Sequence, residues 1–127
     1  MKKVILVDAW KTFVIEQGIF QEMKELLDKF DNKKIVLTNA NEEEKKKYGI
    51  ANVPYEVFSL AHNPNKTNPE YYRKLLEHFS LNSDDVIYFE HSEEAVKSAQ
   101  SVGIKTFHYN PETKDLIDLK SFLISNL

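Results

Sequence analysis

The chain has 127 residues, 42% hydrophobic and 12% aromatic, which is enough for one buried core, and this length predicts a single domain over residues 1–127. Its net charge of −3 and the absence of a basic block give no support for nucleic-acid binding, and the absence of cysteine excludes disulfides and thiolate metal sites. The first apolar run is too short for a signal peptide or a membrane span, so we expect a cytoplasmic protein with no membrane partner.

The first predicted element is a strand over residues 4–7, followed directly by Asp8. Four unbroken aliphatic residues indicate a strand that is buried on both faces, as in a parallel sheet. Asp8 would then lie at the carboxyl edge of the sheet, where open α/β folds place ligands. The alternative is that Asp8 only caps the following turn.

The next segments predict a helix and a second strand. After a mixed stretch that ends at Gly18, the apolar residues of 19–30 follow a helical spacing. Residues 35–37 form a short apolar run that leads into Thr38 and Asn39, which predicts a second buried strand with polar residues at its end.

The middle of the chain carries two helix starts. Asn41 and Glu44 have the spacing of a capping box, and the charged helix that follows would be solvated and would end at Gly49. Residues 55–60 are a third, weaker strand. Asn68-Pro69-Glu70 combines an N-cap, a proline at the first position and an acid in the first turn, so a helix begins there.

The last third of the chain continues the alternation. Residues 86–89 predict a fourth strand, Ser92 caps a helix that Gly103 closes, and residues 104–108 and 116–127 predict a fifth strand and a final helix.

Alternating strands and helices predict the α/β class, as a three-layer, Rossmann-like sandwich with about five mainly parallel strands and helices on both faces. Right-handed crossovers would bring the loops after the strands to one edge. Those loops carry Asp8, Thr38-Asn39, Lys66 and Glu90-His91-Ser92.

Together these side chains could carry out phosphoryl chemistry. Asp8 is a candidate nucleophile, and Thr38 and Asn39 could bind an anion. Lys66 offers a positive charge, and Glu90 with Asp8 offers oxygen ligands suited to Mg²⁺.

Each of these residues also has an ordinary interpretation. Thr38 and Asn39 could be turn and cap residues, Lys66 a surface lysine, and Glu90 an acid favoured by a helix dipole. We interpret His91 as a loop histidine without a role, in preference to a metal ligand.

With these motifs in order, the sequence resembles the haloacid dehalogenase-like (HAD) hydrolase superfamily over nearly its whole length. The residues that carry the resemblance are a strand ending in Asp8-Ala9-Trp10-Lys11-Thr12, a strand ending in Thr38-Asn39, the segment Lys66-Thr67-Asn68-Pro69-Glu70, and a strand followed by Glu90-His91-Ser92 with Ala99 and Gly103. The resemblance implies a Mg²⁺-dependent phosphatase that acts through an aspartyl-phosphate on a phosphorylated small molecule or macromolecule.

The resemblance also implies roles for individual residues. Asp8 would be the nucleophile, Thr38 a phosphate ligand and Lys66 the lysine that stabilises charge. Mg²⁺ would lie between Asp8, the main-chain carbonyl of Trp10 and an acid of the fourth motif, for which Glu90 is the candidate.

Several residues depart from the family pattern. Trp10 occupies the place of the usual acid/base aspartate, whose help is typically worth about 10²–10⁴-fold. Lys11 replaces a frequent glycine, His91 stands at the place of a metal-directed aspartate, and Ala95 at that of a second acid or asparagine. An aromatic residue two positions after the nucleophile also resembles the metal-free 2-haloacid dehalogenase branch.

That branch carries a helical cap domain, whereas the gaps after Asp8 and after Asn39 have no room for one. We therefore expect a capless core with an open site. Three hypotheses stay open: a Mg²⁺-dependent phosphatase, a catalytically impaired member that binds a phosphorylated ligand or a protein partner, and a metal-free hydrolase of the dehalogenase type.

Overall fold

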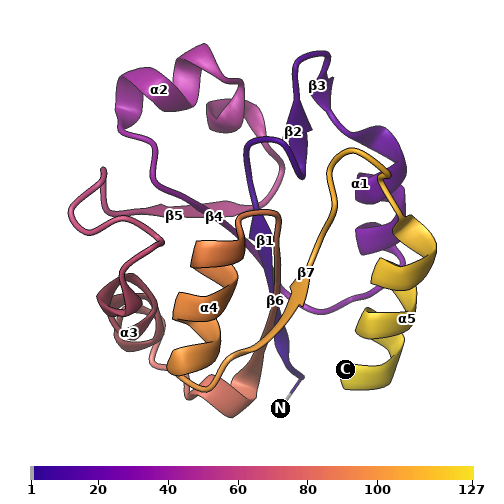
Figure 1. The fold of residues 1–127 in the computed structure, drawn as a ribbon. Coiled ribbons are helices and arrows are strands. Elements are labelled where there is room, and N and C mark those ends of the chain that lie inside the picture. The colour runs from indigo at the N-terminus through magenta and orange to yellow at the C-terminus, as the bar shows by residue number, and fades with distance from the viewer. Residues whose placement is uncertain (1) are drawn as a thin grey trace.

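A computed structural model describes residues 2–127 as a central parallel sheet between layers of helices (Figure 1). Five strands make the sheet in the order β5-β4-β1-β6-β7, so β1 is its central strand. The strands are β1 (Val4–Asp8), β4 (Lys34–Thr38), β5 (Glu56–Ser59), β6 (Val86–Glu90) and β7 (Lys105–His108). The predicted three-layer α/β class is confirmed.

The helices cover both faces of this sheet. They are α1 (Gln21–Asp28), α2 (Glu42–Lys47), α3 (Pro69–His78), α4 (Glu93–Ser101) and α5 (Leu116–Asn126), with 3₁₀ turns η1 (Ile50–Asn52) and η2 (Ser83–Asp85). Helices α1 and α5 pack on one face, and α3 and α4 pack on the other. Helix α2 buries no residue and lies beyond the carboxyl ends of the strands (Figure 1).

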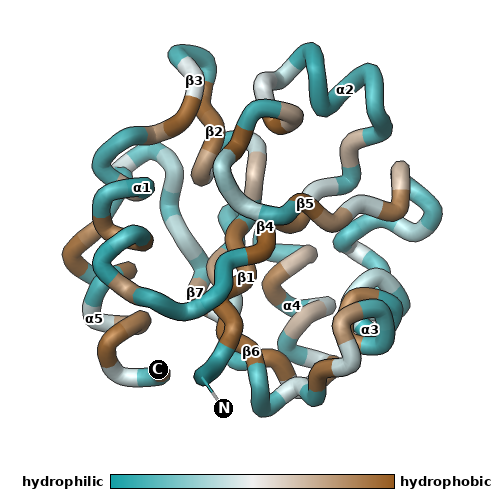
Figure 2. Tube along the Cα trace, turned by 180° about the vertical axis from the view of Figure 1, so that it is seen from behind, coloured by the Kyte–Doolittle hydropathy of each residue, from teal (hydrophilic) through white to brown (hydrophobic). Residues whose placement is uncertain are grey.

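The apolar run of β1 is buried because helices cover it from both sides. Ile5 and Val7 belong to the core under α1 and α5, while Val4 and Leu6 belong to the core under α3 and α4. Successive side chains of a strand point to opposite faces, so a strand between two helical layers needs apolar residues at every position. Figure 2 shows hydrophobic segments along β4 and β6 as well.

The predicted starts of α2, α3 and α4 are confirmed. Asn41 forms a capping box with Glu44, Asn68 caps α3 with Pro69 in its first turn, and Ser92 accepts a hydrogen bond from the main chain of α4. Gly49 follows α2 with a φ of +76°, a left-handed conformation that glycine adopts without strain.

The segment before α1 differs from the prediction. Residues 19 and 20 were expected to be helical, but β2 (Val14–Ile15) and β3 (Gly18–Ile19) form an antiparallel hairpin, and α1 begins at Gln21. The apolar spacing of a helix continues back through Ile19 and Phe20, so the sequence pattern does not reveal that α1 begins at Gln21. Gly18 has a φ of +115°, which permits the tight turn, and the main-chain N–H of Phe20 donates to Phe13 rather than within a helix.

The described part of the chain contains no inserted cap domain, as expected. The hairpin and α1 connect β1 to β4, and α2 with η1 connects β4 to β5. Among residues 2–127, no helix combines the length and the apolar character needed to cross a bilayer.

Candidate active site

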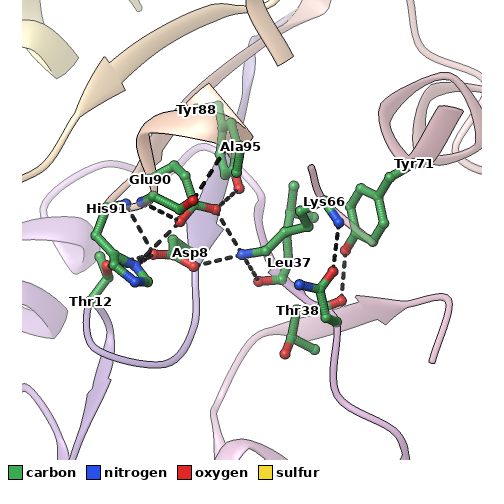
Figure 3. A network of polar contacts seen from close by, with 12 residues as sticks. Asp8, Thr12, Leu37, Thr38, Lys66, Tyr71, Tyr88, Glu90, His91 and Ala95 are labelled. Atoms are coloured by element: carbon green, nitrogen blue, oxygen red, sulfur yellow. Dashed lines mark hydrogen bonds and ion pairs between the residues drawn. The ribbon is translucent and has the colours of Figure 1, made fainter. Parts of the chain in front are cut away.

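A cavity of about 340 Å³ lies at the carboxyl edge of the sheet. Its lining includes Asp8 from the end of β1, Thr38 from the end of β4, Glu90 from the end of β6, and Lys66 from the loop before α3 (Figure 3). The parallel topology brings the four loops together here, as the right-handed crossovers predict.

Asp8 is buried, with an exposed fraction of 1%. Its Oδ1 accepts one hydrogen bond, from Lys66 Nζ at 2.7 Å. Its Oδ2 accepts hydrogen bonds from Thr12 Oγ1 at 2.6 Å and from the main-chain N–H of His91 at 3.2 Å, and it also contacts His91 Nδ1. Because a carboxylate oxygen has two lone pairs, Oδ1 keeps one that is free to react.

Lys66 is also buried, although lysines are usually exposed. Its ammonium group donates to Asp8 Oδ1 and Glu90 Oε1, both at 2.7 Å, and to the carbonyl of Leu37 at 3.3 Å. All three N–H donors are therefore used. Lys66 fixes both carboxylates and balances their charge, and it acts on a ligand through charge rather than through a free donor.

Glu90 is fully buried at the end of β6. Its Oε1 accepts from Lys66 and from the hydroxyl of Tyr88, and its Oε2 accepts from the main-chain N–H of Ser92 at 3.0 Å. Burial raises the pKa of the Tyr88 hydroxyl well above its usual value, so this group stays protonated and can donate. Lys66 thus links Glu90 to Asp8.

His91 contacts both acids of this network, which the sequence did not predict. Its Nδ1 contacts Asp8 Oδ2 and lies 3.3 Å from Glu90 Oε2. Both neighbours are hydrogen-bond acceptors, so Nδ1 must carry a proton. The main-chain carbonyl of His91 also accepts a hydrogen bond from His108 Nε2 at 2.9 Å.

These contacts set the charges of the site. Burial would raise the pKa of Asp8, but the charge of Lys66 and the hydrogen bond from His91 outweigh burial and lower that pKa well below its usual value. Burial would lower the pKa of Lys66, but Asp8 and Glu90 raise that pKa well above its usual value. The hydrogen bonds to Asp8 and then to Glu90 raise the pKa of His91 to about 9. Asp8 is therefore ionised near neutral pH, and Lys66 and His91 are protonated.

Thr38 and Asn39 play different parts at the end of β4. Thr38 Oγ1 accepts a hydrogen bond from the main-chain N–H of Ala40 at 3.1 Å, which leaves its own hydroxyl hydrogen for a ligand. Asn39 Oδ1 instead accepts from the main-chain N–H of Lys66 at 2.7 Å, so its carbonyl oxygen joins two loops.

An apolar wall faces the charged groups across the cavity. Trp10 packs on Tyr48 with ring centroids 4.7 Å apart, and Ala40 and Ile50 also line the cavity. An indole has no ionisable group near neutral pH, so Trp10 can contribute packing but no proton transfer to the reaction.

No protein-family model matches this chain, and no curated protein matches its sequence. Its fold is similar to a HAD family enzyme from Bacteroides thetaiotaomicron, solved with magnesium and inorganic phosphate, at a TM-score of 0.69 and 12% identity over 87% of this chain and 95% of that chain. It is also similar to the core domain of a protein named provisionally as a phosphoglycolate phosphatase, from Streptococcus pneumoniae, at a TM-score of 0.64 and 20% identity over 98% and 96% of the two chains.

A third similar structure is a HAD-superfamily hydrolase from Geobacter sulfurreducens, at a TM-score of 0.56 and 22% identity over 72% of this chain. This chain spans about half of that protein, 47% of its length. The chain has the haloacid dehalogenase-like fold.

Asp8, Glu90 and His91 offer possible ligand atoms that all lie within 4.8 Å of one another. In the arrangement described, this set does not fit a divalent ion. Every carboxylate oxygen of Asp8 and Glu90 already accepts a hydrogen bond, and the nitrogen that points at both acids carries a proton. Hard divalent ions prefer carboxylate, carbonyl and water oxygens, and a protonated nitrogen cannot ligate. Coordination by Asp8, Glu90 and the carbonyl of Trp10 stays a prediction.

Sequence reasoning missed three polar residues of this candidate site. Thr12 is fully buried against Asp8, Tyr88 donates to Glu90, and Tyr71 donates to the main-chain carbonyl of Thr38 at 2.9 Å. Thr12 falls inside the first motif, which was a usable signal. Tyr71 and Tyr88 look like ordinary core aromatics in the sequence, and only their contacts give them a polar role.

Proposed function

We propose that this protein is a phosphatase-type hydrolase of the HAD superfamily that acts through an aspartyl-phosphate on Asp8. The buried ion pair between Asp8 and Lys66, in the same cavity as Thr38, carries this proposal. Burying two charges is costly, and a carboxylate with a strongly shifted pKa in a cleft is typical of functional sites.

The first step transfers the phosphoryl group to the protein. Asp8 Oδ1, with its free lone pair, attacks the phosphorus of a phosphomonoester, a new P–O bond forms, and the bond from phosphorus to the ester oxygen breaks. Lys66 balances the charge of the site, and the Thr38 hydroxyl donates to a phosphoryl oxygen. Asn39 holds the Lys66 loop in place.

The second step restores the carboxylate. Water attacks the phosphorus, the bond to Asp8 Oδ1 breaks, inorganic phosphate leaves, and the proton of the water passes to the phosphate. Because Trp10 cannot act as a base, this step is slow, and the aspartyl-phosphate accumulates.

The proposed substrate follows from the lining of the cavity. With no acid at Trp10 to protonate the leaving oxygen, esters with weakly basic leaving groups react best. The wall of Trp10 and Tyr48 suits a planar apolar leaving group, so aryl phosphates are the first substrates to test. Without a cap domain over the cavity, the phosphate could belong to a small molecule or to a macromolecule.

Magnesium belongs to this proposal only as a prediction. The HAD family enzyme from Bacteroides thetaiotaomicron was solved with magnesium and phosphate, and Asp8, the Trp10 carbonyl and Glu90 are the candidate ligands in this chain. When bound, such an ion would neutralise negative charge on the phosphoryl group. The steps above assign it no part, because the present hydrogen bonds do not fit it.

A second candidate function is binding of a phosphorylated ligand without turnover. Trp10 favours it, since its ring packs on Tyr48 where an acid/base carboxylate would have to stand. A site that keeps Asp8, Thr38 and Lys66 but lacks a proton donor could hold a phosphoryl group and fail to release a product.

An aryl-phosphate assay tests the proposal, with Asp8→Asn as the test variant. Asp31→Asn is the matched control, because it makes the same change at an exposed aspartate that pairs only with Lys2 among the described residues. We expect the wild type and Asp31→Asn to release phenolate equally, and Asp8→Asn to fall to the uncatalysed rate.

Intact-protein mass spectrometry after mixing with the substrate should also find one added phosphoryl group on the wild type and none on Asp8→Asn. Equal background from wild type and Asp8→Asn would contradict the phosphatase proposal. Binding of inorganic phosphate in the absence of turnover would then favour the second candidate.

A further inference from the structure

The imidazole of His91 lies beside both carboxylates of the site (Figure 3). Its Nδ1 is in hydrogen-bond contact with Asp8 Oδ2 and lies 3.3 Å from Glu90 Oε2. A Mg²⁺ ion bound to both of these oxygens at about 2.1 Å would have to lie against this nitrogen. The ring occupies that place, and it would have to leave before an ion could enter.

The carboxylate oxygens of the two acids also accept hydrogen bonds from the protein. Asp8 uses Oδ1 for Lys66 and Oδ2 for Thr12, and Glu90 uses Oε1 for Lys66 and Oε2 for the N–H of Ser92. Each of these donors would have to be displaced or shared for a divalent ion to gain its oxygen ligands.

Two hydrogen bonds of its own main chain hold His91 in this position. The main-chain N–H of His91 donates to Asp8 Oδ2 at 3.2 Å, and its carbonyl accepts from His108 Nε2 at 2.9 Å. The side chain is 26% exposed, and His91 lines the cavity. Among the hydrogen bonds of the described residues, none uses Nε2 of this ring, which leaves that atom available to a ligand oxygen.

We propose that His91 fills the position that a divalent cation would need between Asp8 and Glu90, and that the cavity therefore binds phosphoryl oxyanions without a metal ion. The inference rests on the proposed function for the class of ligand, a phosphate or phosphate ester. In this proposal His91 is the hydrogen-bond donor that supplies, at this edge of the sheet, the electrostatic stabilisation that the ion would otherwise provide.

Metal binding can be measured without any turnover. Titration of the wild-type protein with Mn²⁺, followed by electron paramagnetic resonance, should reveal no saturable site. The His91→Asp variant removes the ring and adds an oxygen ligand beside Asp8 and Glu90, so it should gain one Mn²⁺ site.

Phosphate binding is measured in the same proteins through the fluorescence of Trp10, the one tryptophan of the chain, which lines the cavity. The wild type should bind inorganic phosphate with the same Kd in EDTA and in Mg²⁺. In His91→Asp, Mg²⁺ should tighten phosphate binding by about tenfold, since metal and anion then stabilise each other.

The control is His78→Asp, which adds the same carboxylate at an exposed histidine of α3 that the structure places outside the cavity lining. It should behave as the wild type does. If His91→Asp does not fold, His91→Asn keeps a neutral side chain of similar reach, and it should weaken phosphate binding in EDTA.

Three results would overturn the inference: a saturable Mn²⁺ site in the wild type, loss of its phosphate binding in EDTA, or a His91→Asp protein that folds and still binds no Mn²⁺. These outcomes are separable from the proposed function. Phosphate binding without metal and without turnover keeps the inference and refutes the phosphatase, whereas turnover that requires Mg²⁺ does the reverse.

Discussion

Replacing Lys66 by methionine should destabilise the protein strongly, because Lys66 is the shared partner of two buried acids. Asp8 and Glu90 have exposed fractions of 1% and 0%, and each is 2.7 Å from the Lys66 ammonium. Methionine fills most of the volume but leaves both carboxylates without their cation.

The expected cost follows from that geometry. Breaking a buried ion pair by removing one partner costs about 3–5 kcal/mol, a large part of the roughly 5–15 kcal/mol that stabilises a typical domain. At about 4 °C for each kcal/mol in a protein of this size, the melting temperature should fall by about 12–20 °C. The stability of the variant should increase as the pH falls, because protonation then removes the unpaired charges.

Urea denaturation and thermal melting followed by circular dichroism would measure this. Lys74→Met, at an exposed lysine of α3, is the matched control and should change stability by less than about 0.5 kcal/mol. The double variant Lys66→Met/Asp8→Asn should recover part of the loss, since one unpaired charge is gone. A Lys66→Met protein as stable as Lys74→Met, or a double variant that recovers nothing, would refute the assignment of Lys66 as the cation of a buried network.

Three more predictions concern the residues around this network. Trp10→Asp should raise aryl-phosphate turnover by about 10²–10⁴-fold by supplying the missing acid and base, and Trp10→Phe should not; a folded Trp10→Asp without a gain would contradict this. Since the pKa of His91 is raised from 6.5 to about 9, its contribution to stability is complete below pH 6.5 and is lost as the pH rises through 9. The wild-type melting temperature should therefore fall more over that range than that of His91→Gln, and parallel curves would argue against the Asp8 contact. Tyr88→Phe should lower the free energy of unfolding by about 1–3 kcal/mol, because it removes a donor from buried Glu90, and an unchanged urea midpoint would speak against that bond.

The site combines parts that normally belong to catalysis with one that does not. In the proposed mechanism, Asp8, Lys66 and Thr38 supply the attack and the charge balance that phosphoryl transfer needs. Trp10 would remove proton transfer from the dephosphorylation step. Such a protein would be phosphorylated on Asp8 faster than it is dephosphorylated, which makes the lifetime of the aspartyl-phosphate the quantity that separates an enzyme from a binding protein.

One local prediction failed for a clear reason. Ile19 and Phe20 continue the helical spacing of α1, but they lie in and beside the hairpin of β2 and β3. The same apolar residues satisfy either arrangement, because both bury Phe20 in the core under α1 and α5. Only the pairing of Val14 with Ile19 decides between them.

The sequence by itself determined the five strands of the sheet, the starts of α2, α3 and α4, and the edge at which Asp8, Thr38 and Lys66 meet. Each of these follows from local patterns: apolar runs, capping residues and the alternation that requires parallel strands. Tertiary structure alone decided the role of His91, which meets Asp8 across 83 positions of the chain, and that of Tyr88, whose hydroxyl finds a buried acid. Hydrogen bonds between distant residues depend on how side chains are placed in three dimensions, and no spacing along the chain encodes that placement.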